Sequence, residues 1–267
     1  MDFAETEDQK MIRGMVREFA EDVAGPTCNK RDKEQIAPIE EFKKFAELGF
    51  AGMTIPEKYG GQKLDDISEA IVIEELSRVD PSLGVMVAVH VGLCSMTIAL
   101  SGSKEQKEKY LPKLASGEFL GAYSLSEAGS GTDAAAMVAR ATDNGEHYTL
   151  NGEKMWVTNG TTADIFVLFA KVTNHPDYGK KSHGGVTCFI IEKGFEGFEI
   201  GKKEDKLGIR SSDTCTLILN ECKVPKANVL GDVGKGFPIA MNALDNSRIG
   251  IAAQGLGIAQ GAYEAAL

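Results

Sequence analysis

The sequence is poor in cysteine and has no surplus of basic residues. Its five cysteines are scattered and form no Cys-x-x-Cys pair, so neither a disulfide framework nor a zinc site is indicated. The 39 acidic residues outnumber the 29 basic ones and leave a net charge of -10, which opposes general affinity for nucleic acid or an anionic membrane. An anionic ligand would therefore need a local basic site. A reducing cytoplasm is the expected compartment.

The sequence also lacks a basic leader and has a single long apolar run. Residues 1–19 carry acidic residues where a targeting peptide would be basic, so no signal or transit peptide is expected there. The apolar run, residues 83–100, has His90 near its centre and no flanking aromatic or basic cluster. We predict a buried core helix rather than a membrane span. His90 is expected to be a hydrogen-bonded core residue, since no partner lies at metal-ligand spacing.

Helical periodicity dominates the first part of the chain. Apolar residues recur at three- and four-residue steps from Met11 to Ala20, which predicts an amphipathic helix. We interpret the acidic pair Glu74 and Glu75 as a solvated helix face. Further helices are predicted over residues 38–48, 65–79, 83–100 and 103–114.

After Gly117 the pattern changes to short β-rich runs separated by turn residues. Turn signals occur at residues 143–145 and again at Asn151-Gly152. A β-domain of barrel or sandwich type with antiparallel strands is therefore expected. Helical periodicity returns at Phe237, and glycines along that helix indicate close packing against another helix. These glycines are Gly250, Gly255, Gly257 and Gly261.

Together these patterns predict an α+β multidomain fold. An N-terminal helical bundle would span residues 1–117, a middle antiparallel β-barrel or sandwich residues 118–233, and the first helix of a C-terminal helical bundle residues 234–267. A single helix with an uncovered apolar face does not make a stable domain. We therefore expect the chain to be truncated, with further polypeptide or a partner covering this helix.

A small-residue loop and a lone tryptophan are the candidate ligand-binding features. The loop at residues 129–134 matches Gly-x-Gly-x-x-Ala, but a hairpin pattern follows it instead of the helix that a dinucleotide fingerprint requires. Unobstructed backbone amides there could still approach phosphate oxygens. Trp156, with hydroxyls at Ser126 and Thr158, suits a flat heterocycle with a polar edge. The alternative is a core tryptophan beside two turn hydroxyls.

Several co-linear motifs resemble those of acyl-CoA dehydrogenases, and are most similar to bacterial butyryl-CoA dehydrogenases. Residues 125–133 (LSEAGSGTD) resemble the family's first signature, and residues 154–160 (KMWVTNG) its flavin-stacking strand. Further matches in the same order are residues 55–61 (IPEKYGG), 206–213 (KLGIRSSD), 224–225 with 228–231, and 236–237 leading to Ser247 and Arg248.

The resemblance implies FAD as cofactor and an acyl-CoA thioester as substrate. The residues implied in FAD binding are Tyr123, Leu125, Ser126, Gly131, Thr132, Trp156, Val157 and Thr158. Those implied in substrate binding are Thr132, Ser182, Asp245 and Arg248. For Arg248 the residues alone leave a second reading open, a surface or interhelical ion pair.

The implied reaction removes a proton α to the thioester and passes a β-hydride to flavin N5, with electron-transferring flavoprotein as acceptor. The resemblance places the base, a glutamate, beyond Leu267 in most members and at the position of Ser247 in a minority. Serine is no unassisted base, so little activity is expected from this chain alone. A homotetramer, a dimer of dimers, is implied for the full-length protein, each FAD site drawing on a neighbouring subunit. The alternatives are a flavin oxidase or monooxygenase of the same architecture, and a non-catalytic acyl-CoA-binding or scaffold protein.

Overall fold

A computed structural model describes residues 4–267, and its first part is a bundle of helices. Thr6 caps the first helix: its hydroxyl accepts from the Gln9 amide, and the Gln9 side chain accepts from the Thr6 amide. The α-helices are α1 (Glu7–Phe19), α2 (Gly25–Glu34), α3 (Ile39–Glu47), α4 (Asp66–Val79), α5 (Pro81–Ala88), α6 (Met96–Ser101) and α7 (Lys104–Ala115). Short π-helical and 3-10 segments join them, η1 (Ala20–Ala24), η2 (Phe50–Gly52), η3 (Glu57–Tyr59) and η4 (Val89–Ser95).

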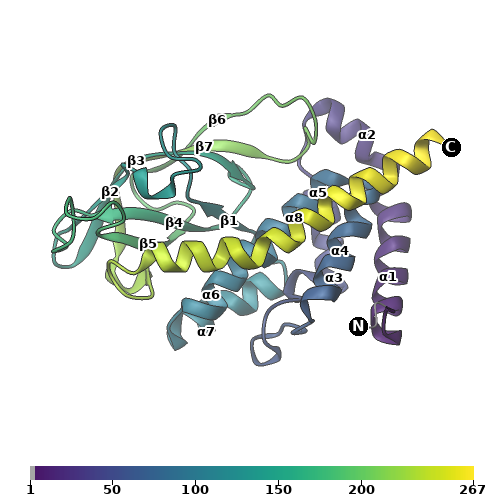
Figure 1. The fold of residues 1–267 in the computed structure, drawn as a ribbon, viewed down its shortest axis with the longest axis horizontal. Helices are drawn as coiled ribbons and strands as arrows, with labels where there is room; N and C mark the ends of the chain where they lie inside the picture. The colour runs from purple at the N-terminus through teal and green to yellow at the C-terminus, as the bar shows by residue number, and fades with distance from the viewer. Residues whose placement is uncertain (1–3) are drawn as a thin grey trace.

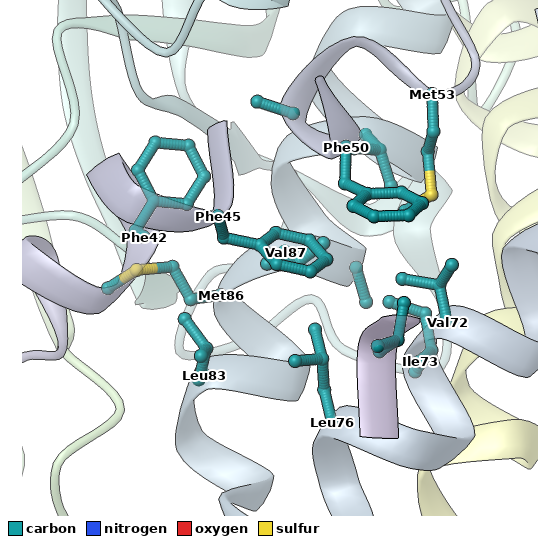
Figure 2. Packing of buried hydrophobic residues seen from close by; sticks show 14 of the residues in the cluster. Phe42, Phe45, Phe50, Met53, Val72, Ile73, Leu76, Leu83, Met86 and Val87 are labelled. Atoms are coloured by element: carbon teal, nitrogen blue, oxygen red, sulfur yellow. The ribbon is translucent and has the colours of Figure 1, made fainter. Parts of the chain in front are cut away.

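Aromatic and aliphatic side chains from α3, α4 and α5 form the core of this bundle (Figure 2). The Phe45 and Phe50 rings stack with centroids 5.1 Å apart. The apolar run forms α5, η4 and α6 in succession, and 78% of its most apolar window is buried. It is long and apolar enough to cross a membrane, but its burial confirms the predicted core helix.

His90 is the core residue that the sequence predicted. Its ring is fully buried, with Nε2 3.1 Å from the Leu114 carbonyl and Nδ1 accepting from the Gly121 amide at 3.0 Å. Burial lowers the pKa of His90 to about 4, so the ring is neutral, and Nε2–H donates to Leu114. His90 thereby ties the apolar helix to the first strand of the β-domain.

The prediction of a solvated face at Glu74 and Glu75 is wrong for Glu75. Its side chain is 1% exposed and lies 2.5 Å from Arg13 and 2.8 Å from Arg17. These guanidinium groups lower the pKa of Glu75 despite its burial. The acidic pair therefore joins α4 to α1, because tertiary contacts brought two arginines of another helix to it.

The middle part of the chain forms an eight-stranded sheet within residues 121–230, in the order β6-β7-β3-β2-β4-β5-β8, with β1 pairing with β4. The strands are β1 (Gly121–Ser124), β2 (Arg140–Asp143), β3 (His147–Thr158), β4 (Ile165–Val172), β5 (Val186–Glu192), β6 (Phe198–Lys203), β7 (Thr214–Pro225) and β8 (Val229–Leu230). Single-turn 3-10 segments η5 (Ala134–Ala136) and η6 (Lys226–Asn228) lie between strands.

Two details of the sheet differ from the sequence prediction. The sheet is mixed, because β1 and β2 both pair with β4 in parallel, one after the other along the same edge. Asn151 and Gly152 lie inside the continuous strand β3 and not at a turn. A register shift against β7 falls between Leu150 and Gly152, so the glycine marks a β-bulge.

A 31-residue helix, α8 (Gly236–Ala266), starts beside β5 and runs along the helical bundle (Figure 1). It packs against α4 at two of the predicted glycines: an added methyl group would lie 2.2 Å from the Glu74 carbonyl oxygen at Gly257, and 2.0 Å from that of Arg78 at Gly261. Close helix packing is therefore confirmed at these positions. Gly255 faces open space and has no such contact. The chain thus has a helical N-terminal part, a middle sheet and the start of a second helical part.

Candidate functional site

One cavity of about 580 Å³ lies where the helical bundle, the sheet and α8 meet. Its volume is within the range of small-molecule sites. Eight of the residues singled out in the sequence line it: Tyr123, Leu125, Ser126, Gly131, Thr132, Trp156, Thr158 and Arg248. Segments far apart in the chain therefore converge on one concave surface.

Trp156 presents its indole to this cavity from an unusual backbone conformation. The side chain is 58% exposed, and its φ of 57° lies in the left-handed region that bulky residues avoid. The register of β3 against β7 shifts between Lys154 and Val157, so Trp156 sits in a β-bulge. Such a bulge re-aims a side chain that regular alternation would direct to the other face.

Hydroxyl groups and an open glycine loop surround the indole. Ser126 and Thr158 both line the cavity, and the Ser126 carbonyl accepts from the Met155 amide at 2.9 Å. Methyl groups added at Gly129 or Gly131 would meet no atom within 4 Å, so packing inside the chain does not require glycine there. An exposed aromatic plane, flanking hydroxyls and an unobstructed loop together fit a flat cofactor with a phosphate-bearing tail.

Tyr123 and Leu125 form the buried wall of the cavity on the β1 side. The Tyr123 hydroxyl donates to the Ala240 carbonyl of α8 at 3.5 Å, and its ring packs against Phe169. Burial raises the pKa of Tyr123 well above its usual value, so the phenol stays neutral. Asn159, directly after β3, links α5 and β1, because its side-chain amide donates to the carbonyls of Met86 and Gly121.

Arg248 brings a cation to the cavity from α8. It donates to Asp245, one turn earlier, at 2.9 Å, and both side chains are more than two-thirds exposed. The ion pair that the sequence left open for Arg248 therefore occurs in the structure, and the side chain also lines the cavity. Its role in substrate binding stays a prediction. An exposed pair of this kind contributes at most about 1 kcal/mol, so the guanidinium can exchange Asp245 for an anionic ligand at little cost.

Three of the singled-out residues do not line this cavity. The Val157 side chain is 1% exposed and belongs to the core of the sheet, so only its backbone can face a ligand. Asp245 reaches the cavity only through Arg248. Ser182 lies in the loop between β4 and β5 and lines a second cavity of about 720 Å³, whose basic wall consists of Arg140, Lys171, Lys180 and Lys181.

Sequence reasoning missed an apolar wall formed by two helices. On α8, Phe237, Met241 and Leu244 line the cavity together with Arg248. Their spacing of four, three and four residues is that of one helix face, a signal that was available in the sequence. Val89 and Leu93 of η4 complete the wall. They could not be singled out, because every face of that helix is apolar. Among residues 4–267 no group of three or more metal-ligating side chains occurs.

Two family models match the chain. Residues 6–118 match "Acyl-CoA dehydrogenase, N-terminal domain" and residues 122–222 match "Acyl-CoA dehydrogenase, middle domain". The short-chain specific acyl-CoA dehydrogenase of Clostridium acetobutylicum is 47% identical over 266 residues, which cover 100% of this chain and 69% of that protein. The chain thus spans about two thirds of the length of this relative.

Solved structures give the same result. Butyryl-CoA dehydrogenase from Megasphaera elsdenii is 42% identical with a TM-score of 0.93, over 98% of this chain and 68% of that one. A chain in a structure described as an electron transferring flavoprotein of Acidaminococcus fermentans is 47% identical with a TM-score of 0.94, over 98% and 68%. An acyl-CoA dehydrogenase from Bacillus anthracis complexed with FAD is 37% identical with a TM-score of 0.87, over 95% and 42%.

Proposed function

The chain belongs to the acyl-CoA dehydrogenase family, and from this premise we propose that it serves the FAD-dependent α,β-dehydrogenation of a short-chain acyl-CoA thioester. The main support for this proposal is the cavity in which Trp156 is exposed, together with two hydroxyl groups, an open glycine loop and one cation. FAD is the cofactor of relatives of this fold. When bound, the flavin supplies the acceptor for a hydride from the β-carbon.

The chain's own residues would bind and orient the two ligands. Trp156 would pack on the flavin ring, and the hydroxyls of Ser126 and Thr158 would donate to its polar edge, where preorganised donors favour developing negative charge. Backbone amides near Gly131 and Thr132 would face phosphate oxygens. The apolar wall from η4 and α8 would exclude water from the acyl group.

The general base is expected outside the cavity-lining residues of this chain. Asp133 is the carboxylic acid among those lining residues, and its side chain already accepts from the Ala135 amide at 3.1 Å. The Ser247 hydroxyl donates to the Leu244 carbonyl at 3.3 Å, and within residues 4–267 no basic side chain is hydrogen-bonded to it. We therefore infer that these 267 residues alone turn over acyl-CoA slowly or not at all.

We place the nucleotide end of CoA at the second cavity. The segment from Gly131 to Val138 borders both cavities. Its first part lines the cavity that contains Trp156, the tryptophan cavity, and its last part lines the cavity that contains Ser182, the basic cavity. Four cations gathered in a protein of net charge -10 make a local site for phosphate groups. Ser182 adds a hydroxyl on that wall. Arg248 would contact the part of CoA between the two cavities.

We also infer the partners and the cellular setting. We infer electron-transferring flavoprotein as the electron acceptor, supported by the similarity to a chain in the A. fermentans structure. A homotetramer and a cytoplasmic location are inferred for the full-length protein. If each FAD site draws on a neighbouring subunit, as the resemblance implies, this chain alone should bind FAD weakly.

Trp156 allows a direct test, since it is the sole tryptophan. Added FAD is expected to quench its fluorescence. Trp156→Ala should weaken FAD binding, measured by equilibrium dialysis, by about tenfold, the loss of one aromatic stacking contact. Tyr263→Ala removes an aromatic side chain that is equally exposed, 60%, but lies outside the cavity, and should bind FAD as the wild type does.

The outcomes separate the proposed function from its alternatives. Equal FAD affinity in the two variants would refute the stacking role of Trp156. Turnover of butyryl-CoA with an artificial acceptor at the rate of a full-length relative would refute the inference about the base. Rapid reoxidation of reduced flavin by oxygen would instead indicate an oxidase or monooxygenase, and acyl-CoA binding without FAD binding a non-catalytic acyl-CoA-binding protein.

A further inference from the structure

A buried ion pair adjoins residues that line the tryptophan cavity. Lys154 of β3 and Glu127, three residues beyond β1, are 2.7 Å apart, with side chains 0% and 5% exposed. Burial lowers the pKa of Lys154, so the ammonium depends on its partner. Replacing a buried ion pair by neutral side chains is often neutral or stabilising, so stability by itself is weak grounds for placing one here.

The other hydrogen bonds of the pair are made to backbone groups near the cavity. Lys154 Nζ also donates to the Leu125 carbonyl at 3.0 Å. The Glu127 carboxylate accepts from the Val138 amide at 2.6 Å and from the Ala139 amide at 3.1 Å. Two side chains thus connect the segment after β1, the segment before β2 and the middle of β3.

The pair also lies next to the bulge that exposes Trp156, since the register shift of β3 begins at Lys154. In a regular strand Trp156 would share a face with Lys154, because side chains two residues apart point the same way. The bulge instead leaves Lys154 and Val157 buried and Trp156 outside. A tryptophan at positive φ costs roughly 1–3 kcal/mol and persists only where its surroundings impose it. Lys154 donates to two acceptors, the Glu127 carboxylate and the Leu125 carbonyl, and can supply such a constraint.

We propose that the Lys154–Glu127 pair is a positioning device that holds Trp156 and the Leu125–Ser126 backbone in the arrangement that receives the flavin. This inference rests on the proposed function for its ligand, but not for its geometry. Neither side chain lines the cavity, so both act through the residues they hold.

The test compares Lys154→Met, Glu127→Gln and the double variant Lys154→Met/Glu127→Gln. Each single variant leaves one buried partner unmatched and should be destabilised. The double variant removes both charges while the glutamine oxygen can still accept from the Val138 and Ala139 amides, so its urea midpoint should return to near the wild-type value. Lys223→Met/Glu196→Gln, which neutralises an exposed pair at 2.9 Å between β7 and the loop before β6, is the matched control.

Two readouts then separate positioning from mere stability. Acrylamide quenching of Trp156 needs no ligand, and it should fall in the double variant as the bulge relaxes and the indole turns inward. FAD affinity should fall by about tenfold in the double variant and remain unchanged in the control. If the double variant retains wild-type stability, quenching and FAD affinity, the positioning role is refuted.

Failure of the proposed function would look different. A wild-type chain that takes up no FAD would contradict the flavin assignment, while the change in Trp156 quenching would still decide whether the pair sets the bulge. Should the double variant fail to fold, Lys154→Met alone carries the test, because it removes the hydrogen bonds of β3 to Glu127 and Leu125 while Glu127 can still accept from the Val138 and Ala139 amides. Unchanged quenching in folded Lys154→Met would then overturn the proposal.

Discussion

Glu69 is expected to make the protein less stable as the pH rises from about 4.5 to about 7. Its side chain lines a cavity of about 160 Å³ between α4, α6 and α8. Burial first, and the nearby charge of Asp66 second, raise the pKa of Glu69 from 4.5 to about 7. Among residues 4–267 no hydrogen bond or ion pair compensates its carboxylate.

The sign of the effect follows from proton binding. Between these two pH values the folded state holds the proton of Glu69 and the unfolded state has released it, so the free energy of unfolding falls as the pH rises. A pKa difference of about 2.5 corresponds to about 3 kcal/mol, and because the carboxyl is only partly buried we expect about 2 kcal/mol. That is a substantial part of a total stability of about 5–15 kcal/mol.

Glu69→Gln isolates this contribution. Urea unfolding should find the variant about 2 kcal/mol more stable than the wild type at pH 8 and nearly equal to it at pH 4.5. Any change in packing caused by the amide acts at both pH values. The difference between the two measurements therefore gives the contribution of Glu69 ionisation to the free energy of unfolding. Glu108→Gln, at an exposed position on α7, should show no such pH dependence. A Glu69→Gln effect of the same size at both pH values would refute the reasoning.

Two further predictions concern the strand β1 and the basic cavity. Gly121→Ala should destabilise the protein by about 1–3 kcal/mol, because its methyl group would lie 2.6 Å from the Cys94 side chain. Gly129→Ala, whose methyl group would meet open space, should leave the urea midpoint unchanged. Equal midpoints for the two variants would contradict this packing. Lys180→Gln/Lys181→Gln should lower the affinity for CoA several-fold at low salt and make that affinity less dependent on salt. The affinity for pantetheine, measured by calorimetry in the same way, should change little. Equal losses of affinity for both ligands would contradict the placement of the nucleotide.

Local patterns in the sequence were sufficient for the element types and for several individual residues. Helical periodicity predicted α1, and α4 and α7 also lie in predicted helical ranges, since such signals involve residues within one or two turns of each other. The same holds for the burial of the apolar helix and for His90 as a core residue. The glycines at 257 and 261 predicted close packing, although they did not identify α4 as the partner.

Features that depend on distant neighbours were beyond the sequence. Asn151-Gly152 has the composition of a turn, yet pairing with β7 on one side and β2 on the other keeps it inside a strand. Glu75 looks solvated in sequence, and two arginines of α1 make it a buried ionic centre. The parallel pairing of β1 and β2 with one strand is likewise a long-range property.

The sequence by itself determined which residue types are available to the site: one tryptophan, flanking hydroxyls, a small-residue loop and a cation in an acidic protein. Only the tertiary structure decided that Trp156 is exposed in a bulge, that Arg248 reaches the same cavity while Ser182 lines another, and that helices complete the wall. The physical reason is range. Propensity and periodicity act over a few residues, whereas the site is assembled from four segments spread along the chain between Val89 and Arg248.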